Sequence, residues 1–305
     1  MNLVKIIFVK ITILIILFFF FNRLSAQPGC TDPQALNYDA NANENDGSCI
    51  YPITNYELSQ ICELPETLEE CSGSELINSG LWIHNDGGNE HKIYRIDSLN
   101  GNILQTVTVG NAENIDWEDL AMDDMGNLYI GDFGNNANNR DNLSIHVLDS
   151  NLNFDRTIKY TYPDQSEFPP IDKENFNYDC EAFFWLNEKL YLFTKNMKNP
   201  YTRVYEMDLL HENQVNLIDS IYLNSPITAA DVRSDGREAV LLSYGKLFFI
   251  DISPENSPPT FAHGYCKKFR NSGQSEAIAY INDNKVMITN ENGKVFLLSR
   301  EPKDN

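Results

Sequence analysis

The chain has 305 residues, a formal net charge of −21 and a hydrophobic content of 42%. This length accommodates one large domain with small additions. A strongly acidic surface repels nucleic acid and anionic lipid headgroups and attracts cations. The composition therefore argues against a nucleic-acid-binding or membrane-surface protein, although the same charge would also keep an extracellular protein soluble.

Residues 1–26 have the parts of a secretory signal: Lys5 and Lys10, an apolar stretch, and small residues ending at Ala26. The apolar stretch is short and poorly flanked for a transmembrane helix, and an uncleaved N-terminal anchor is the alternative. Cleavage after Ala26 removes three basic residues and no acid, which takes the net charge from −21 to −24. We therefore expect an exported protein, secreted, periplasmic or at the cell surface, with no membrane attachment after cleavage.

Residues 27–51 form an Asn/Asp-rich segment bracketed by Cys30 and Cys49. The segment is too polar to build a core, so we expect a Cys30–Cys49 disulfide to hold it together. Oxygen-bearing side chains alternate between Asp39 and Asp46, which suits calcium, although the spacing of an EF-hand is not met. A disulfide-tied spacer without metal is the alternative.

Residues 52–305 carry a repeat that predicts an all-β fold. Each unit has an acid before a small or apolar run, then a turn, a second strand and a third strand. The acids are separated by 48, 63, 50 and 45 residues, and they are Glu70, Glu118, Glu181, Asp231 and Glu276. A period of about 40 to 50 residues with four strands per unit is typical of a β-propeller. The sequence predicts five four-stranded blades.

Residues 54–63 indicate how the ring closes. They form a predicted strand without partners in its own unit, whereas the fifth unit lacks a fourth strand. An N-terminal strand that completes the last blade would remove the open sheet edge. A six-bladed ring is the alternative, with the extra blade in the 63-residue interval. That interval contains residues 162–179, which are Pro-rich, acidic and aromatic and are typical of a long surface loop.

The repeat alignment predicts where chemistry would gather. In a propeller blade, the start of the first strand and the end of the second lie on one face near the axis, called here the ring face. We expect the five repeated acids to form a ring of carboxylates there, with polar loop residues around it. The candidate ligand-binding residues of these loops are Asn85, Asp86, Asp132, Asn135, Asn136 and Asn290.

Oxygen ligands without ordered His or Cys pairs favour Ca²⁺ over zinc. The five acids are therefore the candidate Ca²⁺ ligands. The alternative is that these carboxylates accept backbone N–H groups of the adjacent blade and tie the ring together. Arg140 and Lys195 are the basic residues near this face, where they would pair with the acids or meet an anionic ligand.

Signals for catalysis and further disulfides are sparse. The sequence contains neither G-x-S-x-G nor H-E-x-x-H, and only His84 and His91 are expected near the ring face. Cys62 and Cys71, nine residues apart, are a predicted disulfide. The remaining two cysteines, Cys180 and Cys266, are either a buried pair or two thiols.

Residues 116–136, 177–196 and 273–293 resemble a family of secreted bacterial β-propeller proteins, over residues 62–300 in all. Their E-x-[IL]-A element is similar to that of esterase-like phytases and SdiA-regulated propellers. It is more distantly similar to calcium-dependent phosphotriesterase and lactonase propellers, which implies an axial Ca²⁺ that activates a substrate. Basic residues for a phosphate are scarce here, which argues against a phosphatase. The segment from Gly29 to Tyr51 resembles thrombospondin type-3-like modules.

These observations predict an exported, monomeric binding or scaffold protein with Ca²⁺ on its ring face. Its partner would be a protein, a glycan or a small molecule, with no nucleic acid involved. The alternative is a Ca²⁺-dependent hydrolase of ester or phosphoester bonds, in which the metal polarises the substrate and a carboxylate, His84 or His91 acts as base.

Overall fold

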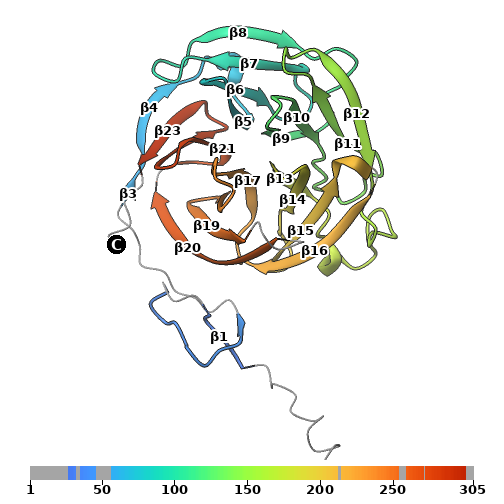
Figure 1. Ribbon diagram of the computed structural model, residues 1–305, viewed down its shortest axis with the longest axis vertical. Coiled ribbons are helices and arrows are strands. Elements are labelled where there is room, and N and C mark those ends of the chain that lie inside the picture. The colour runs from blue at the N-terminus through green and yellow to red at the C-terminus, as the bar shows by residue number, and fades with distance from the viewer. Residues whose placement is uncertain are drawn as a thin grey trace, which may run out of the picture.

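A computed structural model describes residues 27–31, 35–45, 56–211, 214–253, 259–270 and 272–299. It contains five sheets of four or five strands arranged around a central axis (Figure 1). The predicted five-bladed propeller is confirmed. The predicted signal, residues 1–26, lies outside the described residues. Among the residues described, no helix has the length and apolarity needed to cross a membrane.

The strands of each blade follow one another from the axis outward. The first blade contains β5 (Cys71–Ile77), β6 (Gly80–Asn85), β7 (Lys92–Ile96) and β8 (Ile103–Thr108). The second contains β9 (Trp117–Met122), β10 (Leu128–Asp132), β11 (Leu143–Leu148) and β12 (Phe154–Tyr160). The third contains β13 (Cys180–Leu186), β14 (Lys189–Thr194), β15 (Tyr201–Asp208) and β16 (Val215–Tyr222). The fourth contains β17 (Ile227–Val232), β18 (Glu238–Ser243), β19 (Lys246–Ser253) and β20 (Thr260–Arg270). The fifth contains β21 (Ser275–Asn282), β22 (Lys285–Asn290), β23 (Lys294–Ser299) and β4 (Ser59–Glu63).

The fifth blade is closed by the N-terminal strand, as predicted. β4 pairs antiparallel with β23, with Cys62 opposite Val295. A second short strand, β3 (Tyr56–Glu57), adds a parallel edge to β20 of the fourth blade. β3 and β4 therefore add strands to the fourth and fifth blades, although they precede the first blade in the sequence. The ladder of β4 with β23 closes the ring.

The 63-residue interval contains no further blade. Within residues 161–179, the structure shows turns, bends and the short 3₁₀ helix η2 (Lys173–Asn175). This loop is held by its own side chains, because Tyr178 donates a hydrogen bond to Asp164 O at 2.7 Å. The six-bladed alternative is therefore wrong, and the long surface loop is confirmed.

The hydrophobic core lies between neighbouring blades. Successive residues of a strand point to opposite faces of its sheet. In β10, Leu128 and Ile130 pack toward the first blade, whereas Tyr129 packs toward the third. Each buried side chain of this kind contributes roughly 1.5 to 3 kcal/mol to the stability of the fold. The innermost strands β5, β9, β13, β17 and β21 contact one another in sequence around the axis (Figure 1).

The small N-terminal segment contains β1 (Pro28–Gly29) paired in parallel with β2 (Glu44–Asn45). Cys30 is disulfide-bonded. Its predicted partner Cys49 lies outside the described residues, so that pairing stays a prediction. The same holds for calcium in this segment: the described contacts of Asp39 Oδ1 are to the backbone and side-chain N–H groups of Asn41.

The predicted Cys62–Cys71 disulfide is wrong. Cys62 belongs to β4, the outermost strand of the fifth blade, whereas Cys71 begins β5, the innermost strand of the first. Both are thiols. Cys62 Sγ donates to Ser98 O at 3.7 Å, and Cys71 Sγ lies 3.1 Å from Thr289 Oγ1. Nine residues in sequence therefore span the radius of the ring.

Candidate functional site

All five innermost strands carry a β-bulge near their first residue. The pairing with the second strand skips one residue in each, and the skipped residues are Ser72, Glu118, Glu181, Thr228 and Glu276. A bulge re-aims the side chain of the extra residue and often lies beside a functional site. Five structurally equivalent side chains thus stand at the ring-face end of the inner strands. Three of them, Glu118, Glu181 and Glu276, are the axial glutamates.

Two of the predicted ring acids occupy other positions. Glu70 lies two residues before the bulge of β5, in the left-handed conformation with a φ of 66°. Asp231 lies three residues after the bulge of β17, opposite Val240. It therefore lies beside Glu75 on the opposite face, where it lines a hollow of about 1090 Å³. The predicted ring of five equivalent acids is wrong in these two blades, because the acid in the sequence repeat is not the bulged residue.

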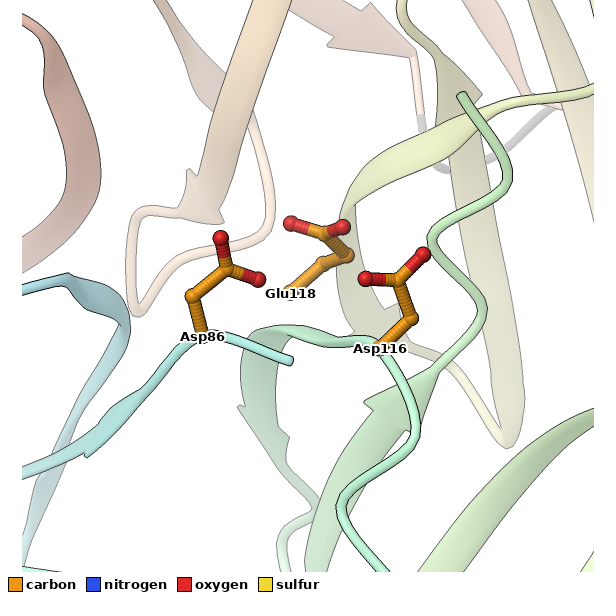
Figure 2. A group of neighbouring side chains, drawn as sticks. All are labelled: Asp86, Asp116 and Glu118. Carbon is orange, nitrogen blue, oxygen red and sulfur yellow. The ribbon is translucent and has the colours of Figure 1, made fainter. Parts of the chain in front are cut away.

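One axial glutamate belongs to a compact acid triad. Asp86 follows β6, Asp116 precedes β9, and Glu118 is the bulged residue of β9. One carboxylate oxygen of each lies within 4.8 Å of those of the other two. Figure 2 shows the three side chains pointing toward one another. The hydroxyl of Ser72 lies 3.3 Å from Glu118 Oε2.

Two glycines allow this close approach. A Cβ at Gly87 would lie 2.5 Å from Asp116 Oδ1, and a Cβ at Gly134 would overlap Glu118 Oε1 and Asp116 Oδ2. Gly134 N also donates to Asp116 O at 3.1 Å. The loops after β6 and β10 therefore fold over the triad, and the absent side chains leave room for the carboxylates.

The triad is electrostatically unbalanced. Burial first, and then the charges of Glu181, Asp86 and Asp116, raise the pKa of Glu118 well above its usual value. Burial likewise raises the pKa of Asp116, partly offset by Arg140, whose Nη1 lies 3.9 Å from Asp116 Oδ2. Like charges at short range disfavour ionisation unless a cation lies among them. The triad is thus a set of oxygen ligands whose negative charge is only partly balanced by Arg140.

The other two axial glutamates meet a lysine. Lys195 Nζ lies 2.9 Å from Glu181 Oε2. Burial would lower the pKa of Lys195, but the charges of Glu181 and Glu276 raise it overall. Tyr244 donates to Glu276 Oε1 at 2.7 Å. Burial nevertheless raises the pKa of Glu276 to about 7. The predicted pairing of Lys195 with the acids is confirmed.

Other buried carboxylates tie the blades together, as the alternative interpretation expected. Asp119 Oδ2 accepts the backbone N–H groups of Phe183 and Ala230, in the third and fourth blades, at 3.2 and 3.1 Å. Asp231 Oδ2 accepts Tyr280 N of the fifth blade at 2.6 Å. The described contacts of the axial glutamates include no such backbone donor. Blade-tying and site-forming acids are therefore different residues.

The predicted ligand-binding residues separate into one triad member and several that hold loops. Asp86 belongs to the triad. Asp132 accepts Arg140 Nη2 at 2.9 Å and Asp116 N at 3.1 Å, so it positions its neighbours. The amides Asn85, Asn135 and Asn290 are buried and bond to backbone groups, whereas Asn136 is exposed. Asn135 and Asn290 accept N–H groups of their own loops, and Asn85 donates to Thr67 O, in the segment before β5. Their role in binding a ligand stays a prediction.

His84 is unsuited to act as a base on this face. Its side chain is fully buried, edge-on against Trp117 at 5.5 Å, and its Nε2 lies over the Cα of Gly73. Burial lowers the pKa of His84 to about 4, so the imidazole is neutral at pH 7. Its Nδ1 lies 2.8 Å from Asn85 O. His91 is exposed in the loop between β6 and β7.

Sequence reasoning missed Asp116, Asp179 and Tyr244. A signal for two of them was present, because Asp116-Trp117-Glu118 and Asp179-Cys180-Glu181 repeat an acid-x-Glu pattern. The first acid of each pair precedes the strand and the second is the bulged residue. Asp179 Oδ1 accepts Asn135 N at 2.6 Å, and burial raises the pKa of Asp179 to about 6.

The sequence matches no family model. It also matches no curated protein. A solved structure titled "Crystal Structure of Mitotic Checkpoint Complex" is similar with a TM-score of 0.41 and 11% identity, over 75% of this chain and 61% of that chain. This chain thus spans less than two thirds of the length of that protein. The propeller architecture rests on the strand pairing.

Proposed function

We propose that this protein is an exported binding or scaffold propeller that holds one Ca²⁺ ion in the acid triad and binds its partner on the ring face. The observation that carries the proposal is the meeting of Asp86, Asp116 and Glu118 oxygens within 4.8 Å. Ca²⁺ takes about six to eight oxygen ligands, which water and backbone carbonyls complete. The triad side chains would bind the ion, and the ion would offer open positions to an oxygen-bearing partner.

The small number of donors that contact the triad supports this assignment. Gly87 N donates to Asp86 Oδ1, and Arg140 Nη1 lies 3.9 Å from Asp116 Oδ2. Asp119 and Asp231 have their oxygens occupied by backbone N–H groups, which leaves no reason to assign them a metal. Glu118 has a weak hydroxyl contact at 3.3 Å. A cation at the triad would supply the positive charge that lowers the pKa of all three acids.

Calcium titration of the mature chain by calorimetry tests the proposal. We expect one Ca²⁺ per chain, and we expect Glu118→Gln to weaken binding at least about tenfold, or 1.4 kcal/mol, because it removes one charged ligand. Glu113→Gln, in an exposed side chain of the same segment, is the matched control and should bind as the wild type does. Equal affinity of Glu118→Gln and the wild type would refute the site.

A Ca²⁺-dependent hydrolase is the second candidate. Glu276 favours it, because a carboxyl group with a pKa of about 7 is suited to general-base catalysis at neutral pH. The hydroxyl of Tyr244 donates a hydrogen bond to one of the two carboxylate oxygens of Glu276. Assays of the calcium-loaded chain with nitrophenyl ester and phosphoester substrates separate this function from binding alone.

A further inference from the structure

The ring-face mouth contains two groups of carboxylates, and Lys195 makes an ion pair in one of them. Its charge also reaches the other group, where it partly offsets the raised pKa of Asp86 and of Asp116. The residues that follow the second strands of four blades lie at equivalent positions above the axial glutamates: Asp86, Lys195, Tyr244 and Glu291. On one side, Asp86 and Asp116 meet Glu118, and Arg140 Nη1 lies 3.9 Å from Asp116 Oδ2 at the edge of the triad. On the other, the ammonium group of Lys195 contacts Glu181 and lies 5.9 Å from the centre of the Tyr244 ring.

The lysine half retains unused ligand atoms. Glu181 and Glu276 are 2% and 7% exposed. Glu181 Oε1 and Glu276 Oε2 are buried and have no hydrogen-bond partner among the described residues. The two carboxylates influence each other's ionisation directly, since the charge of Glu276 helps to raise the pKa of Glu181. Buried carboxylate oxygens without a donor are costly unless a cation compensates them.

We propose that Lys195 is an internal cation that occupies the second half of the carboxylate mouth, so that the mouth holds one divalent cation, and that removing its charge opens a second Ca²⁺ site between Glu181 and Glu276. This inference rests on the proposed function for the first site. Lys195 thus determines how many divalent ions bind to the ring face. The number of bound ions in turn sets the net charge that the ring face presents to a partner.

The location of Lys195 in the chain supports this role. It directly follows β14, and its backbone N–H donates to Asp179 O at 2.7 Å, which fixes the start of the side chain beside Glu181. A lysine is a compact point charge that carries three N–H donors. Its ammonium group therefore supplies positive charge to the carboxylates, as an ion would, but it does not coordinate ligands as a metal does.

The test is the stoichiometry of Ca²⁺ binding, measured by calorimetry with CaCl₂ on the mature chain. We expect one ion for the wild type and for the charge-retaining Lys195→Arg, and two ions for Lys195→Met. Lys195→Gln keeps a donor for Glu181 and should also bind two ions, which covers the case in which Lys195→Met fails to fold. Lys189→Met is the matched control, because it removes a charge from β14, the strand that Lys195 follows. Lys189 pairs with Glu206 at 2.6 Å, and this variant should bind one ion.

The outcomes separate the two proposals. One ion in every variant overturns the role of Lys195 and leaves the first site intact. No ion in the wild type with one ion in Lys195→Met and Lys195→Gln overturns the first site and supports the internal cation. No ion in any folded variant overturns both. Circular dichroism of each variant verifies that the chain is folded.

Discussion

At the scale of single residues, Glu118 and Asp119 show how neighbours in sequence acquire different roles. The bulge of β9 inserts Glu118 between the paired residues and aims it at the triad. Asp119, one residue further, accepts backbone N–H groups from Leu120, Phe183 and Ala230. The Glu118 carboxylate therefore has one described donor, the Ser72 hydroxyl at 3.3 Å, and is suited to a cation. The Asp119 carboxylate already has three backbone donors and joins three blades.

This difference predicts that Asp119→Asn affects stability and not calcium binding. The amide replaces one acceptor oxygen with an N–H₂ group that faces backbone donors, so buried N–H groups lose their partner. We expect the free energy of unfolding to fall by about 2 to 3 kcal/mol in denaturant titrations. Asp124→Asn, in an exposed turn of the same hairpin, should change it by less than about 0.5 kcal/mol. A stable Asp119→Asn chain that loses Ca²⁺ would contradict this assignment.

At the scale of elements, the closing strand β4 makes the fifth blade complete. Its ladder with β23 covers an edge that would otherwise present unpaired backbone groups. Ile61 and Cys62 also pack against the core between the fifth and first blades. The ring thus depends on a segment that precedes all the repeats.

A chain that begins at residue 65 should therefore be less stable than one that begins at residue 56. The shorter chain loses β3, β4 and the buried contacts of Leu64. We expect its melting temperature to be lower by roughly 10 °C or more, with dimers or aggregates from the exposed edge of β23. Scanning calorimetry and light scattering measure both. Equal melting temperatures and two monomeric chains would show that β4 does not close the ring.

At the scale of the whole molecule, we expect the buried acids to make stability depend on pH and, through the proposed site, on calcium. Burial raises the pKa of Glu276 from 4.5 to about 7 and that of Asp179 from 3.8 to about 6. Between those values the folded chain holds protons that the unfolded chain has released. The free energy of unfolding therefore falls as the pH rises through this interval. A cation in the proposed triad site would favour the ionised forms of the nearby acids and would therefore reduce the loss.

In EDTA, we expect the melting temperature to fall by about 5 °C or more between pH 5 and pH 8, and to fall less in CaCl₂. Glu276→Gln should reduce the fall in EDTA, because it removes one titrating group with a raised pKa. Burial also raises the pKa of Asp231 to about 7. Because Asp231 lies on the opposite face, we expect its contribution to the pH dependence to be the same with and without calcium. An identical pH dependence with and without calcium would refute the linkage.

Sequence by itself determined the number of blades, their four strands, the closing strand and the long loop, because repeat spacing and hydrophobic alternation are local properties of the chain. It also placed Glu118, Glu181 and Glu276 correctly on one face. Only the tertiary structure decided which repeat residues are equivalent, because the bulge skips Ser72 and Thr228 where the pattern pointed to acids. The tertiary structure also decided which residues form the triad. Asp86 and Asp116 come from different blades, and their carboxylates meet because the inner strands converge at the axis and two glycines leave space between the loops.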